Sequence, residues 1–282
     1  MNTARIAVAG LGTLLFVALA PATATAGPWS RDSGSFYAKV GQTAFYSGSF
    51  VDISGTVVEG VSNLSFITSA YGEVGIYRGL QVAASVPLTY SCNDFGSGGG
   101  EFCNTSAGDL LVALQYQLPK QLLKPLVLAV RTDLKIPLYS NNNSDPFEHP
   151  RPGDAQIDVT FWLSAGASFG SLPLYAFAEV GYRVRTEAFI GDTPPDREFF
   201  DGVVLSTQVG YKLFNRLTLG VSFGGVIPVK TNSVTKGFLT VGPFAYFPII
   251  GGLAVEASFD PMVYAKASVR GVGASLGISY TR

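Results

Sequence analysis

Histidine, cysteine and charged residues are scarce in this chain. Its 282 residues include one histidine and two cysteines, and charged residues make up only 14% of the total, compared with about 25% in an average soluble domain. A single histidine excludes a histidine-rich metal site, and a formal net charge of −1 gives no sign of a basic surface for nucleic acid. No phosphate-binding loop or dinucleotide fingerprint is present. The sequence therefore predicts no metal, no cofactor and no nucleic-acid partner.

The lone histidine, His149, also argues against hydrolysis. A membrane-embedded hydrolase would need a serine beside a histidine, with an orienting group behind it. Prolines flank the run Phe147-Glu148-His149, and the nearest serine is Ser144, five residues upstream. We therefore assign no catalytic residue and expect the protein not to be an enzyme.

Residues 1–26 have the features of a secretory signal peptide. Arg5 supplies the positive charge, residues 6–20 are mostly apolar, and Ala24-Thr25-Ala26 forms a cleavage site. The alternative is a retained membrane helix, but this apolar run is shorter than the roughly 20 residues that a spanning helix needs. We expect export, cleavage after Ala26 and a single domain over residues 27–282.

No apolar run beyond residue 26 is long enough for a spanning helix, so any membrane insertion must use strands. Residues 125–137 read PLVLAVRTDLKIP, in which Arg131, Asp133 and Lys135 occupy every second position and the intervening residues are mostly apolar. A period of two is that of a β-strand, whose successive side chains point to opposite faces. A soluble sheet could bury the apolar face in a core. A membrane barrel would turn it to lipid and the charges to a wet lumen.

Twelve segments have the composition of strands, and most of them alternate. They span approximately 35–46, 64–77, 80–91, 107–117, 125–136, 154–169, 173–186, 202–212, 216–229, 236–247, 251–264 and 268–281. Connections after the even-numbered segments are mostly short, whereas those after odd-numbered ones include the long stretches 47–63, 92–106, 137–153 and 187–201. Short turns at one end and long loops at the other are typical of outer-membrane barrels.

Aromatic residues close the even-numbered segments near the short-turn side. They are Tyr77, Tyr116, Phe169, Tyr211, Phe247 and Tyr280. All but Tyr77 share the apolar parity of their strand, and Tyr77 would need a β-bulge to do so. Rings at one depth predict an aromatic girdle at the lipid headgroups. The predicted fold is all-β: a transmembrane antiparallel up-and-down β-barrel of about 12 strands.

If the apolar parity faces lipid, a set of polar residues lines the lumen. It comprises Glu73, Gln81, Asp109, Gln115, Arg131, Asp133, Lys135, Asp154, Asp158, Glu179, Arg183, Arg185, Lys212 and Glu256. Two interpretations stay open. The charges could form a constriction that selects solutes, or a salt-bridged ladder that fills the lumen and orders the sheet.

Two further groups lie in predicted loops. In an oxidising compartment Cys92 and Cys103 predict a disulfide that closes an external loop, with a metal site or a reactive thiol as the alternative. Loop carboxylates at Asp192, Asp196, Glu198 and Asp201 could bind a hard cation, although a solvated acidic loop is the simpler interpretation.

Several short runs resemble a known family. They are Gly79-Leu80-Gln81-Val82, Ala107-Gly108-Asp109-Leu110, Lys135-Ile136-Pro137, Pro152-Gly153-Asp154 and Glu179-Val180-Gly181-Tyr182-Arg183. Across most of residues 27–282 the chain is similar to the outer-membrane β-barrel transporters of the phenol meta-degradation (MetA-type) family. The resemblance implies an outer-membrane barrel and, for some members, passage of apolar substrates.

Together, the strand pattern and the resemblance predict a channel in a bacterial outer membrane. Its partners would be membrane lipid and a small-molecule solute, with apolar or aromatic solutes as candidates, and assembly into a homo-oligomer is left open. The alternative is a non-conducting barrel that anchors a surface or periplasmic complex.

Overall fold

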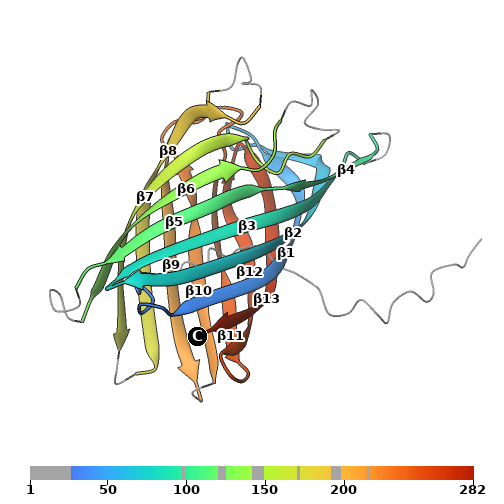
Figure 1. Ribbon diagram of the computed structural model, residues 1–282. Helices are drawn as coiled ribbons and strands as arrows, with labels where there is room; N and C mark the ends of the chain where they lie inside the picture. The colour runs from blue at the N-terminus through green and yellow to red at the C-terminus, as the bar shows by residue number, and fades with distance from the viewer. Residues whose placement is uncertain are drawn as a thin grey trace, which may run out of the picture.

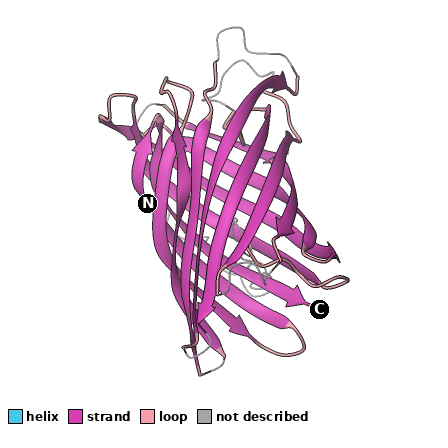
Figure 2. Ribbon diagram, turned by 90° about the vertical axis from the view of Figure 1, so that its left-hand side faces the viewer, coloured by secondary structure: helices cyan, strands magenta, loops and turns pink. Residues whose placement is uncertain are grey.

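The computed structural model describes residues 27–96, 99–119, 125–141, 149–169, 172–191, 198–214 and 216–282. The proposed cleavage site at Ala26 lies outside these residues. Within the described ranges the regular structure consists entirely of β-strands (Figure 2). No helix in them is long and apolar enough to cross a membrane.

Thirteen strands are present in the described part of the chain. In order they are β1 (Phe36–Val51), β2 (Val57–Tyr77), β3 (Leu80–Asp94), β4 (Glu101–Ala107), β5 (Asp109–Gln117), β6 (Val127–Pro137), β7 (Gln156–Phe169), β8 (Leu174–Phe189), β9 (Gly202–Leu213), β10 (Leu217–Pro228), β11 (Gly237–Pro248), β12 (Leu253–Lys266) and β13 (Ser268–Thr281).

The strands form one closed antiparallel barrel. Successive strands pair along the chain, except that β4 and β5 both pair with β3, and β1 also pairs with β13 from Tyr37↔Thr281 to Val51↔Ser268, which closes the ring. Among the described strands only β4 has a single strand partner, β3, and every other strand has partners on both sides. Figure 1 shows the strands running obliquely around this wall.

β4 and β5 together act as one strand of the wall. Both pair with β3, which aligns Leu80–Ser85 with β5 and Leu88–Asp94 with β4. Only Gly108 separates the two, and its N–H donates to Pro87 O across the seam at 2.9 Å. The barrel therefore has twelve strands around its circumference, as the sequence predicts.

The boundaries at the long-loop end differ from the prediction. We expected loops at 47–63 and 92–106, but the β1–β2 connection is only residues 52–56, and β3 and β4 extend through both cysteines. These segments lack a regular alternation of apolar and polar residues, and a bulge lies between Ser47 and Ser49. Backbone pairing does not require an apolar face, so strands can extend without the pattern that identifies them in sequence.

Alternation along each strand separates the two faces of the wall. Outward side chains such as Leu163 on β7 are exposed apolar residues (63% exposed), whereas Arg131 on β6 is 5% exposed. The girdle residue Tyr77 lies outward, because a register shift between Gly75 and Tyr77 supplies the bulge that its parity requires. A lipid-compatible exterior thus encloses a polar interior.

Candidate functional site in the barrel interior

A charged layer crosses the middle of the interior. Arg131 Nε lies 2.9 Å from Asp133 Oδ1, and Arg131 Nη1 lies 3.0 Å from Glu179 Oε1. The indole of Trp162 donates to Asp133 Oδ2 at 2.7 Å, and Ser164 Oγ donates to Glu179 Oε1 at 2.7 Å. We call these five residues the central cluster. All five project inward from β6, β7 and β8 because they share the buried parity.

The guanidinium of Arg131 also lies over the Trp162 ring, 4.7 Å from its centroid. A cation held against a ring face in this way gains further stabilisation when it is desolvated. Beside the cluster, the cavity that Arg131 and Asp133 help to line has a volume of about 20 Å³. Little free space therefore remains between the central cluster and the inner faces of β2, β3 and β5.

The segment before β1, residues 27–35, lies against inward-facing residues of the wall. Arg31 Nε pairs with Glu73 Oε2 at 2.8 Å, and Arg31 N–H donates to Gln81 Oε1 at 2.8 Å. Gln115 Nε2 donates to Gly27 O at 3.2 Å. These contacts hold the segment inside the barrel, below the central cluster toward the short-turn end.

Aromatic side chains of the wall also pack against residues 27–35. The Trp29 ring lies edge-on to Tyr175 and Phe177, at centroid separations of 6.1 Å in each case. Pro28 is among the fully buried side chains. The strand pattern gives no indication that this segment lies inside the barrel; the signal in the sequence is the run Gly27-Pro28-Trp29, an apolar stretch directly after the proposed cleavage site.

A chamber of about 910 Å³ occupies the short-turn half of the interior. Its walls include the rings of Trp29, Tyr175, Phe177, Phe244 and Tyr246, and its rim includes Pro248 to Leu253 of the β11–β12 turn. The chamber therefore reaches the end of the barrel where the turns are short.

Two ion pairs line the polar part of the chamber, Arg31–Glu73 and Lys39–Glu256. Lys39 Nζ lies 2.5 Å from Glu256 Oε2, and Tyr37 O–H donates to Glu256 Oε1 at 2.5 Å. Tyr37 and Lys39 were not in the predicted lumen set, although their shared parity within 35–46 could have identified them. A chamber of this size, with several aromatic rings and several polar side chains in its lining, is within the range of small-molecule sites.

A second charged group lies toward the long-loop end, and we call it the outer cluster. Lys135 Nζ lies 2.6 Å from Asp158 Oδ2 and 3.7 Å from Asp109 Oδ2. Arg185 Nη2 pairs with Asp154 Oδ2 at 2.9 Å, and Arg185 Nε lies 2.9 Å from Asp158 Oδ1. The remaining members are Lys236, whose Nζ lies 3.7 Å from Asp154 Oδ1, and Arg183, the next inward residue on β8.

Asp154 belongs to the loop before β7. Burial alone would raise the pKa of this carboxyl, but Lys236 and Arg185 outweigh that effect and lower the pKa to about 2. Asp154 is thus held in its charged form where the 138–155 connection joins the wall.

The structure divides the predicted lumen charges among separate groups. Arg131, Asp133 and Glu179 form the central cluster. Asp109, Lys135, Asp154, Asp158, Arg183 and Arg185 belong to the outer cluster. Glu73 contacts the N-terminal segment, and Glu256 lies at the chamber.

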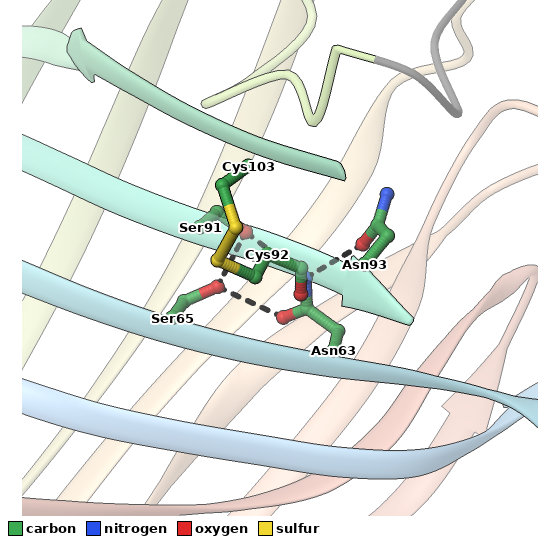
Figure 3. Close-up of a disulfide and its surroundings, with 6 residues drawn as sticks. All are labelled: Asn63, Ser65, Ser91, Cys92, Asn93 and Cys103. Atoms are coloured by element: carbon green, nitrogen blue, oxygen red, sulfur yellow. Dashed lines mark hydrogen bonds between the residues drawn. A yellow bond between two sulfur atoms is a disulfide. The ribbon is translucent and has the colours of Figure 1, made fainter. Parts of the chain in front are cut away.

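The cysteines occupy paired strands. Cys92 on β3 lies directly opposite Cys103 on β4, and the two form a disulfide with Cα atoms 4.1 Å apart (Figure 3). The predicted position within a loop is therefore wrong, because the loop is confined to residues 95–100. Asn63 Nδ2 donates to Ser91 Oγ at 2.9 Å beside the disulfide, which joins this hairpin to β2.

The weaker candidates from the sequence have these positions. His149 is exposed. Asp192 and Asp196 lie outside the described residues, and Asp201 accepts hydrogen bonds from Arg185 N and the Tyr182 hydroxyl. The grouping of Cys92, Glu101 and Cys103 has the proximity of a metal site, but both sulfurs are in the disulfide.

Comparison with known proteins identifies the fold. No protein-family model and no curated protein matches the chain. An outer membrane channel from Pseudomonas putida F1 has a similar structure, with a TM-score of 0.71 and 12% identity over 90% of this chain and 97% of that chain. The translocator domain of the autotransporter NalP from Neisseria meningitidis has a TM-score of 0.53 and 10% identity over 89% and 90% of the two chains. The NanC porin has a TM-score of 0.53 and 11% identity over 86% and 98%. At these identities the likeness shows a shared fold, the closed barrel of outer-membrane proteins.

Proposed function

We propose that this protein is a channel of a bacterial outer membrane that passes small solutes by diffusion through its lumen. The chamber is the observation that carries the proposal. Its volume of about 910 Å³ lies within a closed wall whose outer face is apolar. A barrel that serves only as an anchor has no need of a lined internal space that opens to one rim.

The side chains that line the chamber favour apolar or aromatic solutes. The rings of Trp29, Phe177 and Phe244 offer apolar and aromatic contact, while the charges of the lining are paired, Lys39 with Glu256 and Arg31 with Glu73. A small apolar or aromatic solute would bury its surface against the rings without separating those ion pairs. We further propose that signal cleavage after Ala26 and export precede insertion, and that the chain belongs with the phenol meta-degradation transporters.

Planar-bilayer conductance tests the channel. The purified mature protein should give discrete current steps. Trp29→Ala should enlarge them, because the Trp29 ring lies between Tyr175 and Phe177 on the inner face of β8. Phe36→Ala is the matched control, because the Phe36 ring packs against Tyr280 at the short-turn rim. If wild type, Trp29→Ala and Phe36→Ala all insert into the bilayer but give no current steps, the result would support the alternative, a non-conducting barrel that acts as an anchor.

A further inference from the structure

Arg183 differs from the other basic residues of the interior. Lys39, Arg131, Lys135 and Arg185 each form at least one ion pair with a carboxylate. Among the described residues, the side chain of Arg183 has neither an ion pair nor a hydrogen bond. Its cross-strand partners are Thr160 on β7 and Gly202 on β9, neither of which offers a charge.

The carboxylates near Arg183 are already neutralised. Asp109, Asp154 and Asp158 are the anions whose charges act on it, and they are paired with Lys135, Arg185 and Lys236. The side chains joined by these ion pairs, together with Arg183, are four basic groups and three carboxylates, a surplus of one positive charge; the Asp201 carboxylate forms no ion pair with them and instead accepts hydrogen bonds from the Arg185 backbone N–H and the Tyr182 hydroxyl. A surplus in a desolvated site acts on a solute more strongly than a charge in bulk water.

We propose that Arg183 binds the carboxylate of a monoanionic solute in the outer half of the lumen. This inference rests on the proposed channel and names a class of solute for it. The planar guanidinium fork matches the two oxygens of a carboxylate. A single negative charge balances the outer cluster, whereas a doubly charged phosphate would overcompensate it.

The charged side chains below Arg183 limit how far a bound carboxylate can enter the lumen. The central cluster and the adjoining Arg31–Glu73 pair contain two basic side chains and three carboxylates, a surplus of one negative charge. An anion that enters from the long-loop end meets attraction at Arg183 and repulsion at Asp133 and Glu179. The bound carboxylate is therefore held above the central cluster.

Equilibrium binding to the full mature protein in detergent tests this site with two probes, benzoate and its uncharged counterpart benzamide. Wild type should bind benzoate more tightly than benzamide. Arg183→Gln should weaken benzoate at least roughly tenfold, the effect of losing a hydrogen bond to a charged group, and leave benzamide unchanged. Lys212→Gln removes an exposed charge at the short-turn end and should change neither. Equal affinity for the two probes in wild type, or unchanged benzoate affinity in Arg183→Gln, overturns the proposal.

A second measurement uses wild type alone and does not depend on the variant folding. Phenylglyoxal modifies accessible arginines, and peptide mass spectrometry locates the product. Benzoate should protect Arg183 from modification and benzamide should not; absence of protection contradicts the site. Neither the binding measurement nor the protection measurement depends on ion current. A protein that gives no current steps would therefore refute the channel, whereas the carboxylate site is tested separately by binding and protection.

Discussion

Arg131 on β6 reaches across β7 to Glu179 on β8, with 3.0 Å between Nη1 and Oε1. The same Glu179 oxygen accepts the Ser164 hydroxyl from β7. Three consecutive strands are thereby joined through the lumen as well as through their backbone ladders. In lipid, the apolar outer face gains no stability by packing against other apolar side chains. Contacts between inward-facing side chains therefore help to order the sheet.

Replacing Arg131 should therefore be costly. Arg131→Met leaves the Asp133 and Glu179 carboxylates buried without their cation, and should lower the free energy of unfolding by about 3–5 kcal/mol. Urea titration in lipid vesicles, followed by tryptophan fluorescence, measures the change. Lys212→Met, at an exposed position, should stay within about 0.5 kcal/mol of wild type. Similar values for the two variants would show that the central cluster contributes little.

The orientation of the wall can be tested on β7 alone. Leu163 is exposed on the outer face, whereas Ser168 lines the chamber. Leu163→Arg puts a charge into hydrocarbon and should cost about 2–4 kcal/mol in lipid, and Ser168→Arg should cost less because its side chain faces the chamber. The same titration measures both, and a greater cost at Ser168 would reverse the assigned faces.

Acid should weaken the contact between Asp154 and the outer cluster. Its pKa is lowered from 3.8 to about 2 in the folded protein, so it stabilises the fold fully above its unfolded pKa and loses that contribution as pH falls through about 2. Asp154→Asn should cost about 2 kcal/mol at pH 7, with the cost vanishing below pH 2. Unfolding of both forms at pH 7, 4 and 2 tests this, and a difference independent of pH would contradict it.

Loss of the disulfide should loosen the β3–β4 hairpin. Cross-linking a loop of about a dozen residues is worth roughly 3 kcal/mol in the chain-entropy estimate. Cys92→Ala with Cys103→Ala should speed hydrogen exchange over 88–107 and leave β8 to β10 unchanged. Reductant should reproduce this in wild type and have no effect on the double variant. Unaltered exchange would mean that Asn63 and Ser91 hold the hairpin without the disulfide.

Much of the wall could be predicted from sequence because lipid and lumen impose opposite requirements on neighbouring residues. In 125–137 the alternation of Val130 and Leu134 with Arg131 and Asp133 identifies a strand and its inner face. Near the long-loop end, as at Ser47 and Asn63, the alternation of apolar and polar residues stops although the strands remain paired, so the sequence there resembles a loop.

The interior was less predictable because pairing between distant residues leaves no periodic signal. Parity selects Arg131, Arg183 and Arg185 equally, yet only the packed arrangement shows that two are neutralised and one is not. Nor could alternation reveal the role of Trp29, which precedes the first strand and follows no period.

The seating of Gly27 inside the barrel has a practical consequence for anyone preparing this protein. If cleavage follows Ala26 as we propose, a purification tag joined at Gly27 would begin against Phe177 and Trp29 inside the barrel. Arg282 exchanges backbone hydrogen bonds with Phe36 at the rim, so an extension there leaves the interior undisturbed. Conductance measured on N-terminally tagged protein would then be lowered by the tag inside the barrel. An affinity tag should therefore be placed at the C-terminus.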